Sequence, residues 1–276
     1  MRDFESARAY SALVEAAIEQ GARLGTRQAD PWAARAASFR QDPRRELEAN
    51  TAAVVALIEP GDVVADVGGG AGRIGLPVAL HCRELVNVEP SPAMRQEFEA
   101  SALEAGIQNA RSIERGWPAA AADLEADVVM LANVTYMVRD IVPFVEALDA
   151  AARRRVIISV WSIAPPNHGA VVFELLHGEA QQLAPSYREL LPVIWDLGIL
   201  PDLQVLPDPF RRGGDRPATR EQAIRLALRR ASAEDSPASK AIVETHFDTL
   251  FTVAPEGFVP NWEPPVREML ITWTKR

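Results

Sequence analysis

The stretch VVADVGGGAGRIGLPVA, residues 63–79, decides the fold. It opens with β-branched residues, which favour a buried strand, and closes with apolar residues at the start of a helix. Four glycines lie between residues 68 and 72, and a single acid, Asp66, precedes them. Glycine adopts positive φ angles and lets the backbone approach a ligand without a Cβ in the way. The order strand, glycine-rich turn, helix therefore predicts a ligand-binding loop at the end of the first strand.

Strand and helix patterns alternate around this loop. Short β-branched runs predict strands at 62–67, 84–89, 110–114, 126–133 and 154–161. Helices are expected between them at 72–81, 92–105, 118–124 and 140–152. Ser91 is the expected N-cap of the second of these helices, and Pro92 its first residue. This alternation predicts right-handed βαβ crossovers and a doubly wound α/β sheet.

The two ends of the chain are predicted mainly as helices. Helical spacing of apolar residues appears at 3–24, 43–58, 169–197, 219–231 and 237–250. A strand is expected at 202–207, and the β-rich segment 266–276 is expected to give the sheet a late strand. No internal repeat is present.

Composition excludes several classes of protein. The 276 residues carry a net charge of −9, which disfavours a nucleic-acid partner. The one cysteine, Cys82, excludes an intrachain disulfide, and the four histidines lack metal-binding spacing, so no metal is expected. No apolar run approaches the roughly 18 residues of a membrane span, and the N-terminus lacks the apolar core of a signal peptide. A cytoplasmic protein, monomeric or homodimeric and without a membrane span, is expected.

Two kinds of ligand fit the glycine loop. GAGRIG, residues 70–75, matches the GxGxxG dinucleotide fingerprint, and Glu89 follows Gly70 at about the spacing of the ribose-binding acid. In that fold, however, the loop faces a pyrophosphate, which the Asp66 carboxylate would repel at low dielectric. The same carboxylate favours a ligand that carries an ammonium and a sulfonium group, as S-adenosylmethionine does.

Several segments together resemble a known family. DVGGGAGR (66–73) resembles the first motif of class I S-adenosylmethionine-dependent methyltransferases, and LVNVEPSPAM (85–94) the second. ADVVMLANVTYMVRD (126–140) and RRRVIISV (153–160) are similar to the segments around their fourth and fifth strands. The likeness is nearest to small-molecule methyltransferases of the menaquinone- and ubiquinone-pathway type. It implies a Rossmann-like, mostly parallel, seven-stranded sheet with a final antiparallel strand, and S-adenosylmethionine as cofactor.

The resemblance also implies roles for individual residues. The cofactor-binding residues would be Asp66, Gly68, Gly70, Gly72, Glu89, Trp117 and Asn133. Among them, Asp66 and the backbone of Gly68 and Gly70 would hold the methionine end, and Glu89 the ribose hydroxyls. Gly72 would allow close helix packing, and Trp117 would pack on the adenine. Tyr136 and His168 are the candidate catalytic residues, able to orient or deprotonate an acceptor.

The expected organisation has three parts: an N-terminal helical lid at 1–45, a cofactor-binding α/β core at 46–165, and helical substrate-side elements plus the last strands at 166–276. The predicted function is methyl transfer from S-adenosylmethionine to oxygen, carbon or nitrogen of a small molecule. Two alternatives stay open at this stage. One is an NAD(P)-dependent oxidoreductase that uses the same glycine loop, and the other is a non-catalytic protein that binds S-adenosylmethionine.

Overall fold

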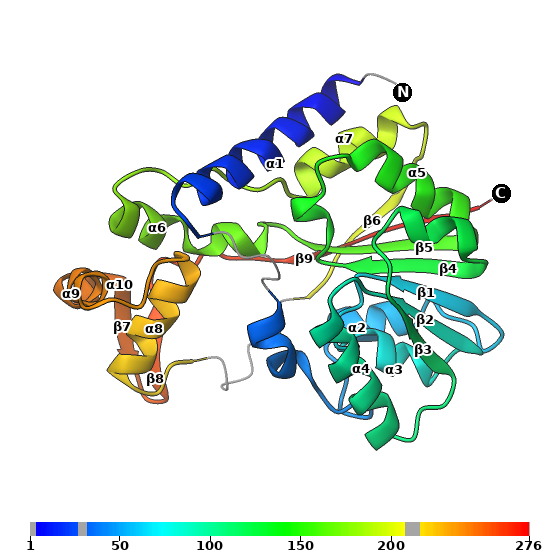
Figure 1. The fold of residues 1–276 in the computed structure, drawn as a ribbon, viewed down its shortest axis with the longest axis horizontal. Coiled ribbons are helices and arrows are strands. Elements are labelled where there is room, and N and C mark those ends of the chain that lie inside the picture. Colours follow the sequence, from blue (N-terminus) through cyan, green and yellow to red (C-terminus); the bar gives the residue numbers. More distant parts are fainter. Residues whose placement is uncertain (1–3, 27–31, 208–215, 276) are drawn as a thin grey trace.

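The computed structural model describes residues 4–26, 32–207 and 216–275. Within them, seven strands form one sheet in the order β3-β2-β1-β4-β5-β9-β6 (Figure 1). The strands are β1 (Val63–Val67), β2 (Glu84–Val88), β3 (Ala110–Ile113), β4 (Ala126–Ala132), β5 (Ala152–Trp161), β6 (Asp202–Val205) and β9 (Glu268–Thr274). The first five pair in parallel, and β9 is antiparallel to both β5 and β6. The predicted doubly wound sheet and its late antiparallel strand are confirmed.

Helices cover both faces of the sheet (Figure 1). One face packs against α1 (Glu5–Arg23), α5 (Ile141–Ala151) and α7 (Tyr187–Asp196), which bury residues such as Val14, Leu148 and Ile194. The other face packs against α2 (Ala49–Val55), α3 (Gly75–Ala79) and α4 (Pro92–Glu104). As predicted, α4 begins at Pro92, and the Ser91 hydroxyl accepts a hydrogen bond from the backbone N–H of Met94.

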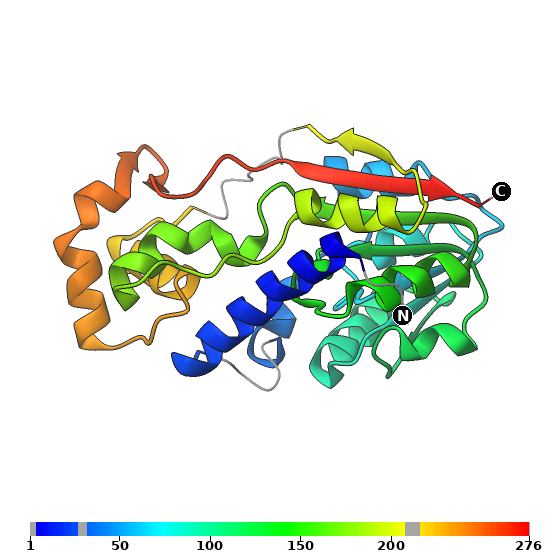
Figure 2. The same cartoon turned by 90° about the horizontal axis from the view of Figure 1, so that it is seen from above.

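A helical lobe with its own core stands at one end of the sheet (Figures 1 and 2). It comprises α6 (Ala170–His177), α8 (Arg220–Arg230), α9 (Pro237–Thr245), α10 (Phe247–Leu250) and the hairpin β7 (Phe251–Ala254) to β8 (Gly257–Pro260). The chain enters this lobe after β5 and leaves it before β9, so the lobe lies at the carboxyl end of β5. Parallel strands share that end, where α/β proteins bind their ligands.

Some predicted elements are shorter than expected. The helix predicted at 43–58 is reduced to α2, because the Asp42 carboxylate accepts the N–H of Arg44 and forms a turn around Pro43. The helix predicted at 72–81 is reduced to α3, since the glycine loop continues to residue 74. Four short 3-10 helices complete the described part of the chain: η1 (Ala33–Phe39), η2 (Ala119–Asp123), η3 (Thr135–Met137) and η4 (Pro165–Gly169). The hairpin β7–β8 and η1 were not predicted.

Candidate functional site

The carboxyl ends of β2, β1, β4 and β5 lie side by side and form the carboxyl-terminal edge of the sheet, referred to simply as the edge. Each is followed by a residue that the sequence singled out: Glu89 after β2, Gly68 after β1, Asn133 after β4 and, further along its loop, His168 after β5. Neighbouring strands are about 4.8 Å apart. The topology therefore brings these four residues to one edge, with Glu89 and His168 at its two ends.

The glycine loop is held close to its neighbours. The N–H of Gly68 donates to the carbonyl of Val88 at 2.8 Å, which joins the loop to the end of β2. Gly68 has a φ of 68°, and a Cβ there would lie 2.7 Å from Cγ2 of Val134. At Gly72, with a φ of 82°, a Cβ would lie 2.6 Å from Cγ of Leu76 and 2.7 Å from Cδ2 of Phe98. Side chains at Gly68 and Gly72 would thus displace the loop.

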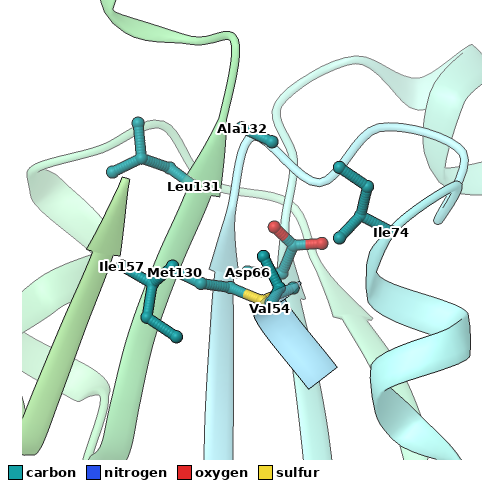
Figure 3. Close-up of a pocket in the computed structure, with 7 residues that line it drawn as sticks. All are labelled: Val54, Asp66, Ile74, Met130, Leu131, Ala132 and Ile157. Atoms are coloured by element: carbon teal, nitrogen blue, oxygen red, sulfur yellow. The ribbon is translucent and has the colours of Figure 1, made fainter. Parts of the chain in front are cut away.

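Asp66 lies beneath this loop. Its side chain is 2% exposed and lies between Val54 and Ile74 (Figure 3), in a space that leaves no room for water. Burial, and secondarily the charge of Glu89, raise the pKa of the Asp66 carboxyl to about 7. Asp66 therefore lies below the loop and not at its outer surface.

Gly69 and Asn87 complete the surroundings of Asp66, and neither was predicted as a site residue. A Cβ on Gly69 would lie 2.6 Å from Oδ1 of Asn87 and still closer to Oδ2 of Asp66. Asn87 is fully buried and stands opposite Asp66 in the register of β1 and β2. Among the described residues, neither of these two side-chain oxygens has a hydrogen-bond partner. The signal available in the sequence was one amide among the three apolar residues of β2, Leu85, Val86 and Val88.

Glu89 and Asn87 hold Gly70 from both sides. Oε2 of Glu89 accepts the N–H of Gly70 at 3.1 Å, and Nδ2 of Asn87 donates to the carbonyl of Gly70 at 3.0 Å. Oε1 of Glu89 accepts the N–H of Ser91 at 2.8 Å. The Glu89 carboxylate therefore ties the glycine loop to the start of α4.

The turn after β4 carries Asn133 and Tyr136. Asn133 has a φ of 61°, a left-handed conformation that asparagine tolerates better than most residues. The Tyr136 hydroxyl donates to Oδ1 of Asn133 at 2.9 Å and accepts the N–H of Trp161 at 2.6 Å. Tyr136 is 4% exposed, and burial raises the pKa of its hydroxyl well above the ordinary value. The Tyr136 hydroxyl is therefore buried and hydrogen-bonded on both sides, an arrangement that disfavours direct proton transfer from an acceptor.

Trp117 follows β3 in the chain, and His168 follows β5. The indole N–H of Trp117 donates to the carbonyl of Phe144 at 3.1 Å, and its half-buried ring packs against the main core. Trp117 is thus anchored to α5. His168, in η4, bonds through Nε2 to the carbonyl of Ile163 at 3.0 Å, so that nitrogen carries a hydrogen. Its neighbour Gly169 packs against the backbone of Arg230 in the lobe, which places His168 where the sheet edge meets the lobe.

The N-terminal segment contacts this edge at two places. Ala36 of η1 is buried against Ala71 of the glycine loop and Met94 of α4. In α1, the buried hydroxyl of Tyr10 donates to the carbonyl of Thr135 at 2.7 Å, within the turn after β4. Both described parts of the predicted lid, 4–26 and 32–45, are therefore packed against this edge, and residues 1–3 and 27–31 of that prediction lie outside the described residues.

The described residues set two further limits. In the ranges 4–26, 32–207 and 216–275, no three His, Cys, Asp or Glu side chains are grouped as metal ligands would be. Over the same ranges, no helix combines the length and the apolar character needed to cross a membrane.

Comparisons with known proteins agree with the fold. No protein-family model matches the sequence, and no curated protein matches it. Among solved structures, a candidate methyltransferase from Bacillus halodurans C-125 is 12% identical over 81% of this chain and 96% of its own, with a TM-score of 0.52. Geranyl diphosphate methyltransferase in complex with SAM is 15% identical over 91% of this chain and 92% of its own, with a TM-score of 0.49. Magnesium protoporphyrin IX methyltransferase from Synechocystis PCC 6803 with bound SAH is 21% identical, with 58% and 77% covered and a TM-score of 0.47. At such identities only the fold carries over, and the likeness to the Bacillus halodurans structure agrees with the predicted Rossmann-like α/β fold.

Proposed function

We propose that this chain is a methyltransferase that binds S-adenosylmethionine and methylates a small-molecule acceptor. The observation that carries the proposal is the carboxylate of Glu89 on the N–H of Gly70, with a second carboxyl group, Asp66, buried under the same loop. A dinucleotide needs the N–H groups of this loop for its pyrophosphate. Here one of them already faces an acid, which favours a cationic ligand.

The residues present fit this cofactor. Glu89 ends β2, and an ionised carboxylate suits the two hydroxyls of a ribose. Gly68 and Gly70 bring the backbone to the surface of the edge, and Gly72 lets the loop pack on α3 and α4. The helix after the loop, α3, spans five residues, too few for a strong dipole at a phosphate site. We assign Trp117 to the adenine flank and Asn133 to the opposite end of the cofactor.

When bound, S-adenosylmethionine supplies a methyl group that its sulfonium has already activated for in-line displacement. The protein then has to align the acceptor, exclude water and, for some acceptors, remove a proton. We retain His168 as the candidate base, since it stands where the edge meets the lobe. We assign acceptor binding to the region 166–276 and coverage of the cofactor to residues 1–45.

Isothermal titration with S-adenosylmethionine and S-adenosylhomocysteine tests the proposal. Micromolar binding of both is expected, and methyl transfer to a panel of small acceptors then distinguishes an enzyme from a non-catalytic binding protein. Absence of binding by a demonstrably folded sample would overturn the proposal. Fluorescence titration with NADH and NADPH tests the oxidoreductase alternative, for which no binding is expected.

The remaining proposals concern the location, the oligomeric state and the partners of the protein. We propose a cytoplasmic monomer or homodimer that takes a small molecule and not a nucleic acid. The net charge of −9 supports a partner other than a nucleic acid. The single cysteine supports a cytoplasmic location. Size-exclusion chromatography with light scattering, and a gel-shift assay with duplex DNA, measure the oligomeric state and any nucleic-acid binding.

A further inference from the structure

The hydroxyl of Tyr136 joins the ends of two neighbouring strands. Its oxygen accepts the N–H of Trp161 at 2.6 Å, at the end of β5, and lies 2.9 Å from Oδ1 of Asn133, just after β4. A backbone N–H can only donate, so the single hydroxyl proton is left for Asn133. An amide turned the other way would leave that buried proton without an acceptor. Tyr136 therefore decides which way round the Asn133 amide stands.

The orientation leaves the amide nitrogen unused. With Oδ1 held by Tyr136, Nδ2 carries two N–H donors, and among the described residues it has no hydrogen-bond partner. The backbone of Asn133 is also constrained, since its N–H donates to the carbonyl of Ser159 at 2.8 Å and its φ is 61°. Both the backbone and the side chain of Asn133 are thus set before any ligand arrives.

Asn133 stands beside the glycine loop, away from Glu89. The next residue, Val134, lies against Gly68, so the turn touches the loop directly. In the sheet, β4 is two strands from β2, which separates Asn133 from Glu89 by about 10 Å along the edge. A cofactor whose ribose is held by Glu89 therefore extends over the loop toward Asn133 with its amino-acid end.

The amino-acid end of the cofactor carries a carboxylate. Asp66 and Glu89 are unsuitable partners for this carboxylate because they would repel it. We propose that Tyr136 is a positioning residue, which holds the Asn133 amide with its NH2 group ready to donate to the amino-acid carboxylate of the cofactor. The inference rests on the proposed function and assigns Tyr136 an indirect role in place of the catalytic one.

A double-mutant cycle on ligand affinity tests this inference. The variants are Tyr136→Phe, Asn133→Gly and the double variant, where glycine keeps the left-handed backbone while removing the amide. Tyr10→Phe is the matched control, because Tyr10 is a second buried tyrosine whose hydroxyl bonds to the same turn without touching Asn133. The ligands are S-adenosylhomocysteine and 5′-methylthioadenosine, which lacks the amino-acid group. Affinities come from isothermal titration and folding from thermal unfolding.

We expect Tyr136→Phe to weaken S-adenosylhomocysteine binding about 3- to 10-fold, the contribution of one hydrogen bond. Binding of 5′-methylthioadenosine should be unchanged, and Tyr136→Phe should add no loss on top of Asn133→Gly. Because Tyr10 lies in the segment assigned to cover the whole cofactor, Tyr10→Phe should lower the melting temperature and leave the ratio of the two affinities unchanged. Unchanged S-adenosylhomocysteine affinity in Tyr136→Phe, equal weakening of both ligands, or additive losses in the double variant would each overturn the inference. If the wild-type protein binds neither ligand, the proposed function fails first.

Discussion

Oε2 of Glu89 accepts a hydrogen bond from the N–H of Gly70 at 3.1 Å, so the acid that ends β2 restrains the loop that follows β1. The other carboxylate oxygen accepts the N–H of Ser91, the N-cap of α4. One side chain thus fixes the loop and the start of a helix, and the same carboxylate is the proposed ribose ligand. Shaping the loop and binding the cofactor are therefore coupled in Glu89.

Replacing Glu89 should damage both properties. Glu89→Ala removes two backbone hydrogen bonds to a charged acceptor, and we expect it to weaken S-adenosylhomocysteine binding by about 1–3 kcal/mol and to lower the melting temperature. Glu114→Ala is the control, because Glu114 is an exposed carboxylate that pairs with Arg95, and such surface pairs contribute little. Wild-type affinity in Glu89→Ala, measured by isothermal titration, would exclude Glu89 as the ribose ligand.

The buried carboxyl of Asp66 should make stability depend on pH. The pKa of Asp66 is raised from 3.8 to about 7 in the folded protein, so between these values the folded state holds a proton that the unfolded state has released. Stability therefore falls by an amount on the order of 4 kcal/mol as the pH rises from about 4 to about 7. Above pH 7 it changes little. Asp66→Asn should remove this decline.

Urea unfolding of wild type and Asp66→Asn at pH 5 and pH 8 measures the effect. The variant should be more stable than wild type at pH 8, with a smaller difference at pH 5. A difference that is the same at both pH values would mean that Asp66 does not change its protonation between them.

The ionisation of Asp66 should also make the affinity for a charged ligand depend on pH. A ligand with a positive sulfonium favours the ionised form of Asp66, so the affinity for S-adenosylmethionine should rise between pH 6 and pH 8. S-adenosylhomocysteine lacks the sulfonium charge, and its affinity should rise less. Titrations of both ligands with wild type and Asp66→Asn give the comparison. Parallel pH profiles for the two ligands in the wild-type protein would separate Asp66 from recognition of the sulfonium.

The N-terminal segment should be protected by the cofactor. Ala36 of η1 is buried on Ala71 of the glycine loop, so ordering of the loop by a ligand should stabilise η1 as well. Limited proteolysis before residue 45 should slow when S-adenosylhomocysteine is added. Cleavage within the lobe, between α8 and α9, serves as the internal reference. An unchanged rate before residue 45 would remove the lid proposal.

Local patterns were enough to predict the sheet and the glycine loop. β1, β2 and β4 are short apolar segments with β-branched residues, a pattern that favours buried strands. Ser91 followed by Pro92 is a strong local signal for the start of α4. The start of the helix predicted at 43–58 was placed too early, because Asp42 accepts the N–H of Arg44 in a turn and the helix, α2, begins only at Ala49.

The interior of the site was less predictable, since it depends on contacts between distant residues. Tyr136 follows β4 just where a substrate-facing residue was expected, yet the N–H of Trp161, 25 residues away, draws its hydroxyl into the interior. The indole of Trp117 is turned in the same way toward the carbonyl of Phe144 in α5. Asn87 was overlooked because its meaning comes from its register with Asp66 on the neighbouring strand. Periodicity along one segment carries no information about such partners.

Replacing Gly69 of the loop should lower the stability of the protein. A Cβ there would press on Asp66 and would lie 2.6 Å from Oδ1 of Asn87, both fully enclosed. Gly69→Ala should therefore destabilise the protein by about 1–3 kcal/mol, the usual cost of overpacking. Gly61→Ala is the matched control, because nothing lies within 4 Å of its added Cβ. Urea unfolding should give near wild-type stability for Gly61→Ala, and removing the Asp66 side chain should relieve part of the Gly69→Ala penalty. If Gly69→Ala is as stable as Gly61→Ala, the loop does not rest on Asp66 and Asn87 as closely as this structure has it.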